Sequence, residues 1–446
     1  MPDTPRRRAA ERLASGESSL AIIGLGYLGY SNLLRYVRHG IHCLATDYNG
    51  ERLSDFADGR YPPSNRFAYW KAVNELNYGR SAGAQPFEVV SPDEIVSRKV
   101  AAYLVCVPYD YREAALSEEI RRTIQLLRRM PIDERPIVVF EAFFKPFTMA
   151  RGVVPEFQRA GLDPAKDFVL AYAPREDWYL EEFEREAVRK VACIGPDAAD
   201  EIRTLFALTS QEAIVTGDFT AVELSECFDH AVHHAASSLL NQMMFAYPEQ
   251  DIREVVRLHR NGGGPLRPGV SNAGSKVSLA SQFLIDAAPR PGYLTLAADT
   301  LSSGFSVQQR LVEILQQRGV RRAALLGLIP HENTAEYKSD PALLVPQLLQ
   351  QAGIDVRVND PFIAPEEIEA LAGTHAFEFP EGLQGADAVM ILTSHTAYQL
   401  IARPDLVRIL SGCRLVLDNT GIWRRHRLQD AGIEYRVLGE AGSLLE

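Results

Sequence analysis

A glycine-rich turn between a short apolar strand and an amphipathic helix restricts the fold of this chain more than any other feature. The β-prone run Leu20–Ile23 is followed directly by Gly24-Leu25-Gly26-Tyr27-Leu28-Gly29. A segment with helical periodicity comes next and ends at Gly40, and residues 41–47 predict a second strand. Strand, turn, helix and strand in this order form the βαβ unit that binds dinucleotides.

Each glycine of the turn has a separate predicted role. Gly24 permits the tight turn, Gly26 lets the backbone approach a pyrophosphate, and Gly29 lets helix and strand pack closely. The helix that begins at Tyr27 and Leu28 offers backbone amides and the positive end of its dipole to the phosphates. The alternative is a Rossmann-like turn that binds no nucleotide.

Asp47 ends the second predicted strand, about 20 residues after the glycines, where an acid binds ribose hydroxyls. An acid there favours NAD over NADP, so NAD is the predicted cofactor.

Further apolar runs at residues 100–108 and 137–140 flank a helical stretch at 117–129. This alternation predicts a doubly wound parallel α/β sheet, with ligands beyond the carboxyl ends of its strands. Pro108 and Glu141 follow such strands and are predicted on the cofactor or active-site rim.

Composition narrows the function classes. The chain has 446 residues, too many for one ordinary core, and its net charge of −11 argues against a nucleic-acid binder. The five cysteines are scattered without metal-ligand spacing, which favours buried free thiols and a cytoplasmic location. No apolar run reaches the roughly 20 residues of a membrane span. The basic N-terminus lacks the apolar stretch of a secretory signal.

Two other patterns have simple interpretations. His230, His233 and His234 have a spacing that a metal site can use, but packed or exposed helix positions with one active-site histidine explain them better, and no metal is predicted. The charge run Glu181–Arg189 is expected to be a solvated helix face.

The stretch Pro268-Gly269-Val270-Ser271-Asn272-Ala273-Gly274-Ser275-Lys276 resembles the active-site loop of the nucleotide-sugar 6-dehydrogenases, the UDP-glucose and GDP-mannose dehydrogenase family. The family pattern is Pro-Gly-x-Gly-x-Gly-Gly-x-Cys, and its cysteine forms a thioester during the oxidation of an alcohol to a carboxylate. Lys276 stands in the place of that cysteine. Further matching motifs occur in the family's order: Gly59–Pro62, Cys106–Pro108, Glu223–Ser225, Leu325–Leu328, Asp360–Pro361 and Ile391–His395.

The resemblance implies the domain organisation. After an extension over residues 1–18, it implies an NAD-binding Rossmann domain at 19–215 and a helical middle at 216–317. The middle is built on a long helix near 220–247 through which the family forms homodimers. A second Rossmann-like domain at 318–446 would hold the nucleoside diphosphate of a nucleotide-sugar substrate.

The departures from the family lie where its chemistry takes place. Glu226 occupies the place of the lysine that stabilises the oxyanion, and His230 replaces an asparagine. Glu141 falls near an expected Ser-Thr pair, and Arg175 stands where a glutamate is usual. Because the exchanged residues are titratable, the predicted catalytic set is Lys276, Glu226, Glu141 and His230. The residues predicted to bind substrate are Arg260, Asn272, Lys276 and Lys338.

Loss of the thiol makes the family's second oxidation unexpected. A single hydride passed to NAD leaves three outcomes: release as NADH, return to the same carbon as in an epimerase, or return after elimination as in a dehydratase. The lincosamide octose branch of antibiotic sugar pathways is similar in kind. We expect the dehydratase or epimerase type, with a simple two-electron dehydrogenase and a non-catalytic binding protein as alternatives.

Overall fold

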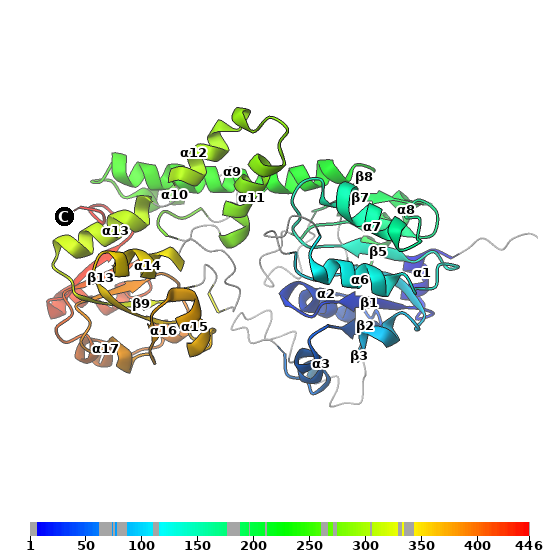
Figure 1. The fold of residues 1–446 in the computed structure, drawn as a ribbon. Helices are drawn as coiled ribbons and strands as arrows, with labels where there is room; N and C mark the ends of the chain where they lie inside the picture. Colours follow the sequence, from blue (N-terminus) through cyan, green and yellow to red (C-terminus); the bar gives the residue numbers. More distant parts are fainter. Residues whose placement is uncertain are drawn as a thin grey trace, which may run out of the picture. The chain divides into compact units, whose positions relative to one another are not determined.

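The computed structural model describes residues 7–61, 74, 76–77, 87–109, 116–175, 188–195, 197–209, 212–259, 266–270, 274–303, 306–328, 332–333 and 343–445. The chain forms two compact units, Met1–Cys227 and Phe228–Glu446. Each unit contains a sheet with helices on its faces (Figure 1). The domain boundaries predicted at 215/216 and 317/318 stay predictions.

The first unit is built on a sheet whose described strands lie in the order β3-β2-β1-β4-β5-β6-β7-β8. Neighbouring strands run parallel, except that β7 is antiparallel to β6. The strands are β1 (Ser19–Ile23), β2 (Cys43–Thr46), β3 (Phe87–Val89), β4 (Val100–Val105), β5 (Ile137–Phe140), β6 (Val169–Tyr172), β7 (Val188–Ile194) and β8 (Glu212–Thr216).

Helices cover both faces of this sheet. They are α1 (Ala9–Ala14), α2 (Tyr27–Arg38), α3 (Gly50–Ala57), α5 (Pro92–Ile95), α6 (Glu118–Leu127), the π-helix η1 (Met149–Val153), α7 (Val154–Arg159) and α8 (Ala198–Ala207). Leu20 and Ile22 of β1 join a core with α1, α2, α3 and α8. Ala21 and Ile23 join the opposite core with α5, α6 and α7. Burial on both faces explains why β1 is a continuous apolar run.

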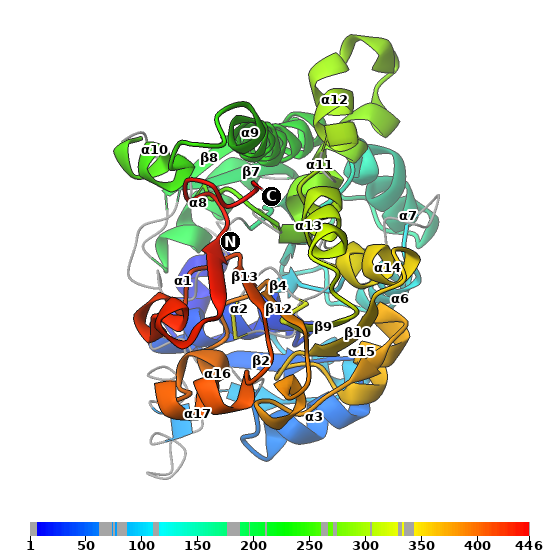
Figure 2. The same ribbon diagram turned by 90° about the vertical axis from the view of Figure 1, so that its left-hand side faces the viewer.

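The second unit contains a sheet of entirely parallel strands in the order β11-β10-β9-β12-β13-β14. The same order is found in the first unit for the six strands β3-β2-β1-β4-β5-β6. The strands are β9 (Arg322–Leu326), β10 (Asp355–Asn359), β11 (His375–Ala376), β12 (Ala388–Ile391), β13 (Leu415–Asp418) and β14 (Glu434–Val437). Figure 2 shows α14 and α15 beside β10, with which both are in contact.

The remaining helices follow the long helix α9 (Phe219–Ala246), which begins in the first unit and continues into the second. They are α10 (Ile252–Leu258), α11 (Gly274–Ala287), α12 (Thr295–Ser303), α13 (Ser306–Gln317), α14 (Leu344–Gln351), α15 (Pro365–Ala372), α16 (Thr396–Gln399) and α17 (Arg403–Ile409). Short 3-10 turns occupy Pro291–Tyr293, Glu381–Leu383, Arg424–His426 and Leu428–Ala431.

The α/β class with two doubly wound sheets is confirmed. The predicted strand at 137–140 is β5, and the long helix predicted near 220–247 is α9 at Phe219–Ala246. One prediction is wrong: Arg189 does not lie on a solvated helix face but in β7, with 4% of its surface exposed. Burial of a charge becomes tolerable there because Arg189 meets the carboxylate of Glu141.

The five cysteine thiols are free and buried, as predicted. Among the helices that the structure describes, none combines the length and apolar character needed to cross a membrane.

Candidate functional site

The glycine turn has the geometry predicted for its three glycines. Gly24 has a φ of +96°, and a Cβ there would lie 2.9 Å from the backbone carbonyl of Cys106. A Cβ on Gly29 would overlap the carbonyl oxygen of Gly24, so helix and turn pack too closely for a side chain. A Cβ on Gly26, which caps α2, would meet nothing within 4 Å. The protein itself requires Gly24 and Gly29, whereas Gly26 leaves open space at the helix N-terminus, where a pyrophosphate fits.

The predicted ribose acid, Asp47, directly follows β2 and is 7% exposed. Its Oδ2 accepts a 2.6 Å hydrogen bond from the backbone N–H of Leu25, and its Oδ1 accepts one of 2.8 Å from Asn49. The guanidinium of Arg52 lies 3.3 Å from Oδ2. Asp47 therefore ties the end of β2 to the glycine turn, at the carboxyl edge of the sheet where the cofactor is predicted.

The other predicted cofactor residues lie around the same edge. Tyr27 and Leu28 form the first turn of α2. Pro108 follows β4, is exposed, and its carbonyl accepts a 3.3 Å hydrogen bond from the Ser117 hydroxyl. These positions are those that a doubly wound sheet uses for ligands.

Glu141, predicted for both cofactor binding and catalysis, is 2% exposed and surrounded by donors. Asn32 of α2 donates an amide hydrogen bond to its Oε2, and the Arg189 guanidinium lies 3.2 Å from its Oε1. The Cys106 thiol lies 3.8 Å from Oε2. Because both carboxylate oxygens are held by the protein interior, the arrangement favours a role in holding neighbouring elements over transfer of a proton.

A second buried acid, Glu226, lies near the start of α9 and has no exposed surface. The ammonium of Lys190 lies 3.6 Å from its Oε2, and the Lys190 side chain is 23% exposed. Lys190 belongs to β7, whose antiparallel direction brings residues 188–190 beyond Tyr172, the carboxyl end of β6. The structure therefore adds a cation to the predicted site. Sequence reasoning missed Lys190 because it lies beside other charged residues and its partner, Glu226, is distant in sequence.

Glu223, one helical turn before Glu226, holds the loop after β5. Its carboxylate accepts hydrogen bonds of 2.7 Å from the N–H of Phe147 and 2.8 Å from the N–H of Met149. Burial raises the pKa of Glu223 to about 7, against the opposing effect of these backbone donors. Burial, together with the carboxylates of Glu226 and Glu223, raises the pKa of Tyr172 well above its usual range.

The histidines of α9 lie in the second unit. His230 is 5% exposed. Nδ1 of His234 lies 3.1 Å from the Ser281 hydroxyl, and burial lowers the pKa of His234 to about 4, which keeps its ring neutral near pH 7. Within the described ranges, no group of three or more His, Cys, Asp or Glu side chains is arranged to hold a metal ion.

The predicted active-site loop begins at an anchored segment. Gly269, with a φ of +124°, donates its N–H to the Asn241 side chain at 2.8 Å and accepts from the same amide at 3.1 Å. Val270 makes the equivalent pair with Asn419, at 2.9 and 2.7 Å. Lys276 lies in the first turn of α11. The predicted residues Arg260, Asn272 and Lys338 fall outside the described residues.

Asn241 and Asn419 were not predicted as site residues. They come from α9 and from the end of β13, far from the loop in sequence, and no motif links them to it. Only folding brings their amides against Gly269 and Val270.

The second unit repeats the turn geometry of the first. Gly327 follows β9 with a φ of +87° and donates its N–H to Asn359 at 2.8 Å, as Gly24 does to Thr46 at 2.9 Å. Asp360 follows β10, and its Oδ2 accepts a 2.9 Å hydrogen bond from the N–H of Leu328.

A buried histidine extends this arrangement. His395 Nε2 lies 3.2 Å from the Asp360 carboxylate, while its Nδ1 accepts from the N–H of Asn333 at 2.9 Å. Acceptance at Nδ1 places the ring proton on Nε2. The Asn333 side chain in turn pairs with Thr396, so Asn333 is held against the start of α16.

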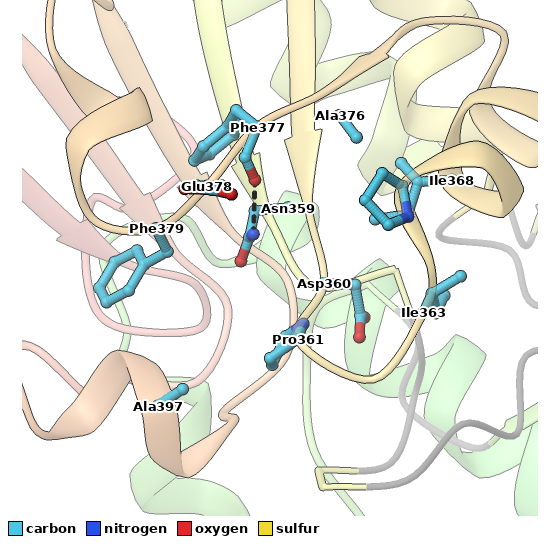
Figure 3. A pocket seen from close by; sticks show the side chains of 11 residues that line it. Asn359, Asp360, Pro361, Ile363, Ile368, Ala376, Phe377, Glu378, Phe379 and Ala397 are labelled. Atoms are coloured by element: carbon cyan, nitrogen blue, oxygen red, sulfur yellow. Dashed lines mark hydrogen bonds between the residues drawn. The ribbon is translucent and has the colours of Figure 1, made fainter.

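A cavity of about 510 Å³ lies beside Asp360 (Figure 3). Its walls are Asn359, Asp360, Pro361, Ile363, Pro365, Ile368, Ala376, Phe377, Glu378, Phe379 and Ala397. The Asn359 amide is already bonded to the Phe377 carbonyl at 2.7 Å and to the Tyr398 hydroxyl at 2.9 Å. These lining residues include two acids and no Lys or Arg, so the cavity suits an uncharged group better than a phosphate.

Comparisons with known proteins agree with this geometry. Residues 324–425 match the UDP binding domain of the UDP-glucose/GDP-mannose dehydrogenase family. The match covers the larger part of the sheet of the second unit, from β9 to the residues after β13. The chain is 20% identical over 438 residues to UDP-N-acetyl-D-mannosamine dehydrogenase of Methanocaldococcus jannaschii, covering 94% of this chain and 96% of that protein.

Solved structures show the same fold over nearly the whole chain. A UDP-D-ManNAc dehydrogenase from Pyrococcus horikoshii has a TM-score of 0.74 at 17% identity, covering 95% of this chain and 100% of that one. A UDP-glucose dehydrogenase from Pyrobaculum islandicum has a TM-score of 0.74 at 20% identity, covering 96% and 98%. These relatives are named as dehydrogenases, which is consistent with the predicted NAD cofactor.

Two alanine substitutions in the turn should separate folding from cofactor binding. Gly29→Ala should destabilise the first unit, because the new methyl overlaps the Gly24 carbonyl. Gly26→Ala should leave the thermal midpoint close to that of the wild type but weaken NAD binding at least about tenfold, because the methyl fills space left for phosphate. Thermal melts and NAD titration calorimetry test the pair. Unchanged NAD affinity in Gly26→Ala would contradict the predicted phosphate position.

The raised pKa of Glu223 predicts a pH-dependent stability difference. The folded protein binds the proton of the Glu223 carboxyl more tightly than the unfolded chain does. The resulting contribution to the free energy of unfolding is fully present below the usual pKa of 4.5 and is lost as pH rises to about 7. Relative to Glu223→Gln, which cannot titrate, the wild type should lose on the order of 3 kcal/mol of unfolding free energy across this window.

Urea unfolding at about pH 4.5 and about pH 8 measures the difference. The exposed Glu212 of β8 offers a matched control, because Glu212→Gln should track the wild type at both pH values. A constant difference between wild type and Glu223→Gln would show that Glu223 titrates normally.

Proposed function

We propose that this chain is an NAD-dependent oxidoreductase that acts on a nucleotide-linked sugar by a single hydride, returned internally in a dehydration or epimerisation. The observation that carries the proposal is Lys276 at the position of the family's cysteine. It stands in the first turn of α11, six residues after Val270, which like Gly269 is held by a pair of hydrogen bonds to an asparagine side chain. The scaffold is retained while the group needed for a second oxidation is absent from that position.

The cofactor proposal rests on the first unit. The open space at Gly26, the N-terminus of α2 and the Asp47 carboxylate are the three features that a dinucleotide needs at the edge of such a sheet. NAD, when bound, would supply a hydride acceptor. An acid at Asp47 would repel the 2′-phosphate of NADP.

The substrate proposal rests on the second unit. The match to a UDP binding domain makes a UDP-linked sugar the first candidate. The cavity beside Asp360 has apolar walls and aromatic side chains for a flat nucleoside and no cation among its lining residues for a phosphate. Relatives of similar length are named UDP-N-acetyl-D-mannosamine dehydrogenase, which supports a nucleotide sugar as the substrate class here.

Among the exchanged residues, the proton chemistry is assigned to Lys276 and Glu226. A lysine amine at position 276 can polarise a carbonyl or accept a proton alpha to it, but it cannot form the thioester through which a thiol leads to a carboxylate. The close pair of Glu226 and Lys190 holds opposite charges 3.6 Å apart and can exchange a proton with a departing hydroxyl. His230 stays a further candidate on α9.

Mass spectrometry of small molecules released from the denatured, purified protein tests the proposal. NAD near one per chain, with a sugar nucleotide converted without net NADH, is the expected result. Stoichiometric NADH release from an added sugar nucleotide would instead identify a simple two-electron dehydrogenase. Binding of NAD or a nucleotide sugar without any product would identify a non-catalytic binding protein.

Lys276→Ala should abolish turnover, at least about a thousandfold in kcat, while NAD affinity stays that of the wild type, because the cofactor residues lie in the first unit. Lys276→Arg is the matched variant that retains charge but not a titrating amine. Turnover assays on sugar nucleotides and NAD calorimetry measure both effects. Full activity of Lys276→Ala would rule out this mechanism.

We also propose a homodimer formed through α9. Phe228, Val232 and Leu239 lie on one face of this helix and are 61%, 50% and 58% exposed. Large apolar side chains aligned along a helix are costly in water and mark a protein interface.

Val232→Glu should therefore shift the protein from dimer to monomer, as measured by light scattering after size exclusion. Val255→Glu, at an exposed apolar residue on α10, is the control. A monomeric wild type, or a Val232→Glu variant that stays dimeric, would contradict the α9 interface.

A further inference from the structure

A chain of buried polar contacts connects helix α2 to the loops after β5 and β6. Arg175, which follows β6, donates from Nη1 to the Ser31 hydroxyl and to Oδ1 of Asn32, both at 2.7 Å. Asn32 donates from its Nδ2 to Oε2 of Glu141, which follows β5. Arg189 approaches the other carboxylate oxygen at 3.2 Å. All of these residues are at most 4% exposed.

The chemistry of the two charged ends fixes the orientation of the amide between them. A guanidinium can only donate and a carboxylate can only accept, so the Asn32 oxygen must face Arg175 and its nitrogen must face Glu141. An amide in this place satisfies a cation on one side and an anion on the other. No aliphatic side chain of the same size can do so, and unsatisfied buried charges are strongly disfavoured.

The contacts reach the part of the fold that the cofactor needs. Ser31 and Asn32 lie within one turn after Gly29, on the helix whose N-terminus faces the predicted pyrophosphate. Glu141 and Arg175 begin the loops at the carboxyl edge of the sheet, where ligands of doubly wound sheets lie. These side-chain contacts therefore link the helix that follows the phosphate-binding turn to the residues that directly follow β5 and β6.

We propose that Asn32 and Arg175 are positioning residues for the dinucleotide. Arg175, Asn32 and Glu141 form a relay that holds α2 in register with the residues that directly follow β5 and β6, so that the helix N-terminus and these strand ends present one preformed cofactor surface. Arg175 faces the interior rather than substrate, and Glu141 serves the relay rather than a proton transfer. The inference rests on the proposed NAD-binding function and adds to it the residues that set cofactor affinity.

The relay can be tested by moving its negative charge from position 141 to position 32. Asn32→Asp places two carboxylates against each other and should weaken NAD binding at least about tenfold. Glu141→Gln has only one side-chain oxygen, so it cannot accept from both Asn32 and Arg189, and one of these donors then faces an amide N–H; this variant should weaken NAD binding similarly. The double variant N32D/E141Q restores every donor and acceptor. The carboxylate introduced on α2 accepts from Arg175 and from the new amide after β5, whose oxygen accepts from Arg189. The net charge of the double variant equals that of the wild type.

The expected result is recovery of the NAD dissociation constant in the double variant to within roughly threefold of the wild type. NAD calorimetry is done at a temperature where thermal melts show every variant folded. The control is Asp200→Asn. It removes an exposed carboxylate on α8 that pairs with Arg8 and Arg203, and this variant should bind NAD as the wild type does.

The outcomes separate the two proposals. Variants that melt earlier yet bind NAD with the wild-type constant would show that the relay only supports the fold, and would overturn the positioning role. Weakened binding in both single variants without recovery in the double would overturn the relay as the link. A wild type that binds no NAD would instead overturn the proposed function, and this inference with it.

Discussion

In each unit, an aspartate that follows one strand accepts a hydrogen bond from the backbone turn that follows the neighbouring strand. The strands are β2 and β1 in the first unit, and β10 and β9 in the second. Asp47 accepts from the N–H of Leu25, and Asp360 accepts from the N–H of Leu328. The turn after the first strand has its N–H groups pointing away from the sheet ladder, so they need an acceptor. One aspartate per unit supplies it, and in both units the glycine just before this contact has a positive φ.

Several buried charged side chains lie at the carboxyl edge of the first sheet. Glu141, Arg175 and Arg189 satisfy one another with the help of Asn32, and Glu226 is paired with Lys190. Buried ion pairs contribute little net stability because desolvation offsets their attraction. Their presence at the ligand edge fits a role in shaping a surface for binding and proton exchange better than a role in stability.

Much of the fold could be predicted from local pattern. Apolar runs of four to nine residues between helical segments predicted β1, β4 and β5. The family resemblance, rather than local periodicity, predicted α9 within one residue at each end. Arg189 was misassigned because a charge beside a run of acids resembles a solvated face. Lys190, Asn241 and Asn419 escaped notice because their partners are distant in sequence, and no spacing records a contact made only by folding.

The sequence by itself determined the first doubly wound unit and the glycine turn with its acid, because each depends on residues adjacent along the chain. The resemblance of short motifs to a known family predicted the second unit, and placed Lys276 where the family pattern has a cysteine. Only the tertiary structure decided what the exchanged charges do. Glu141 and Arg175 point into the protein and meet through Asn32, whereas Glu226 meets Lys190. A buried charge requires a partner within a few ångströms, and which side chain provides it is settled by strand order and direction rather than by distance along the chain.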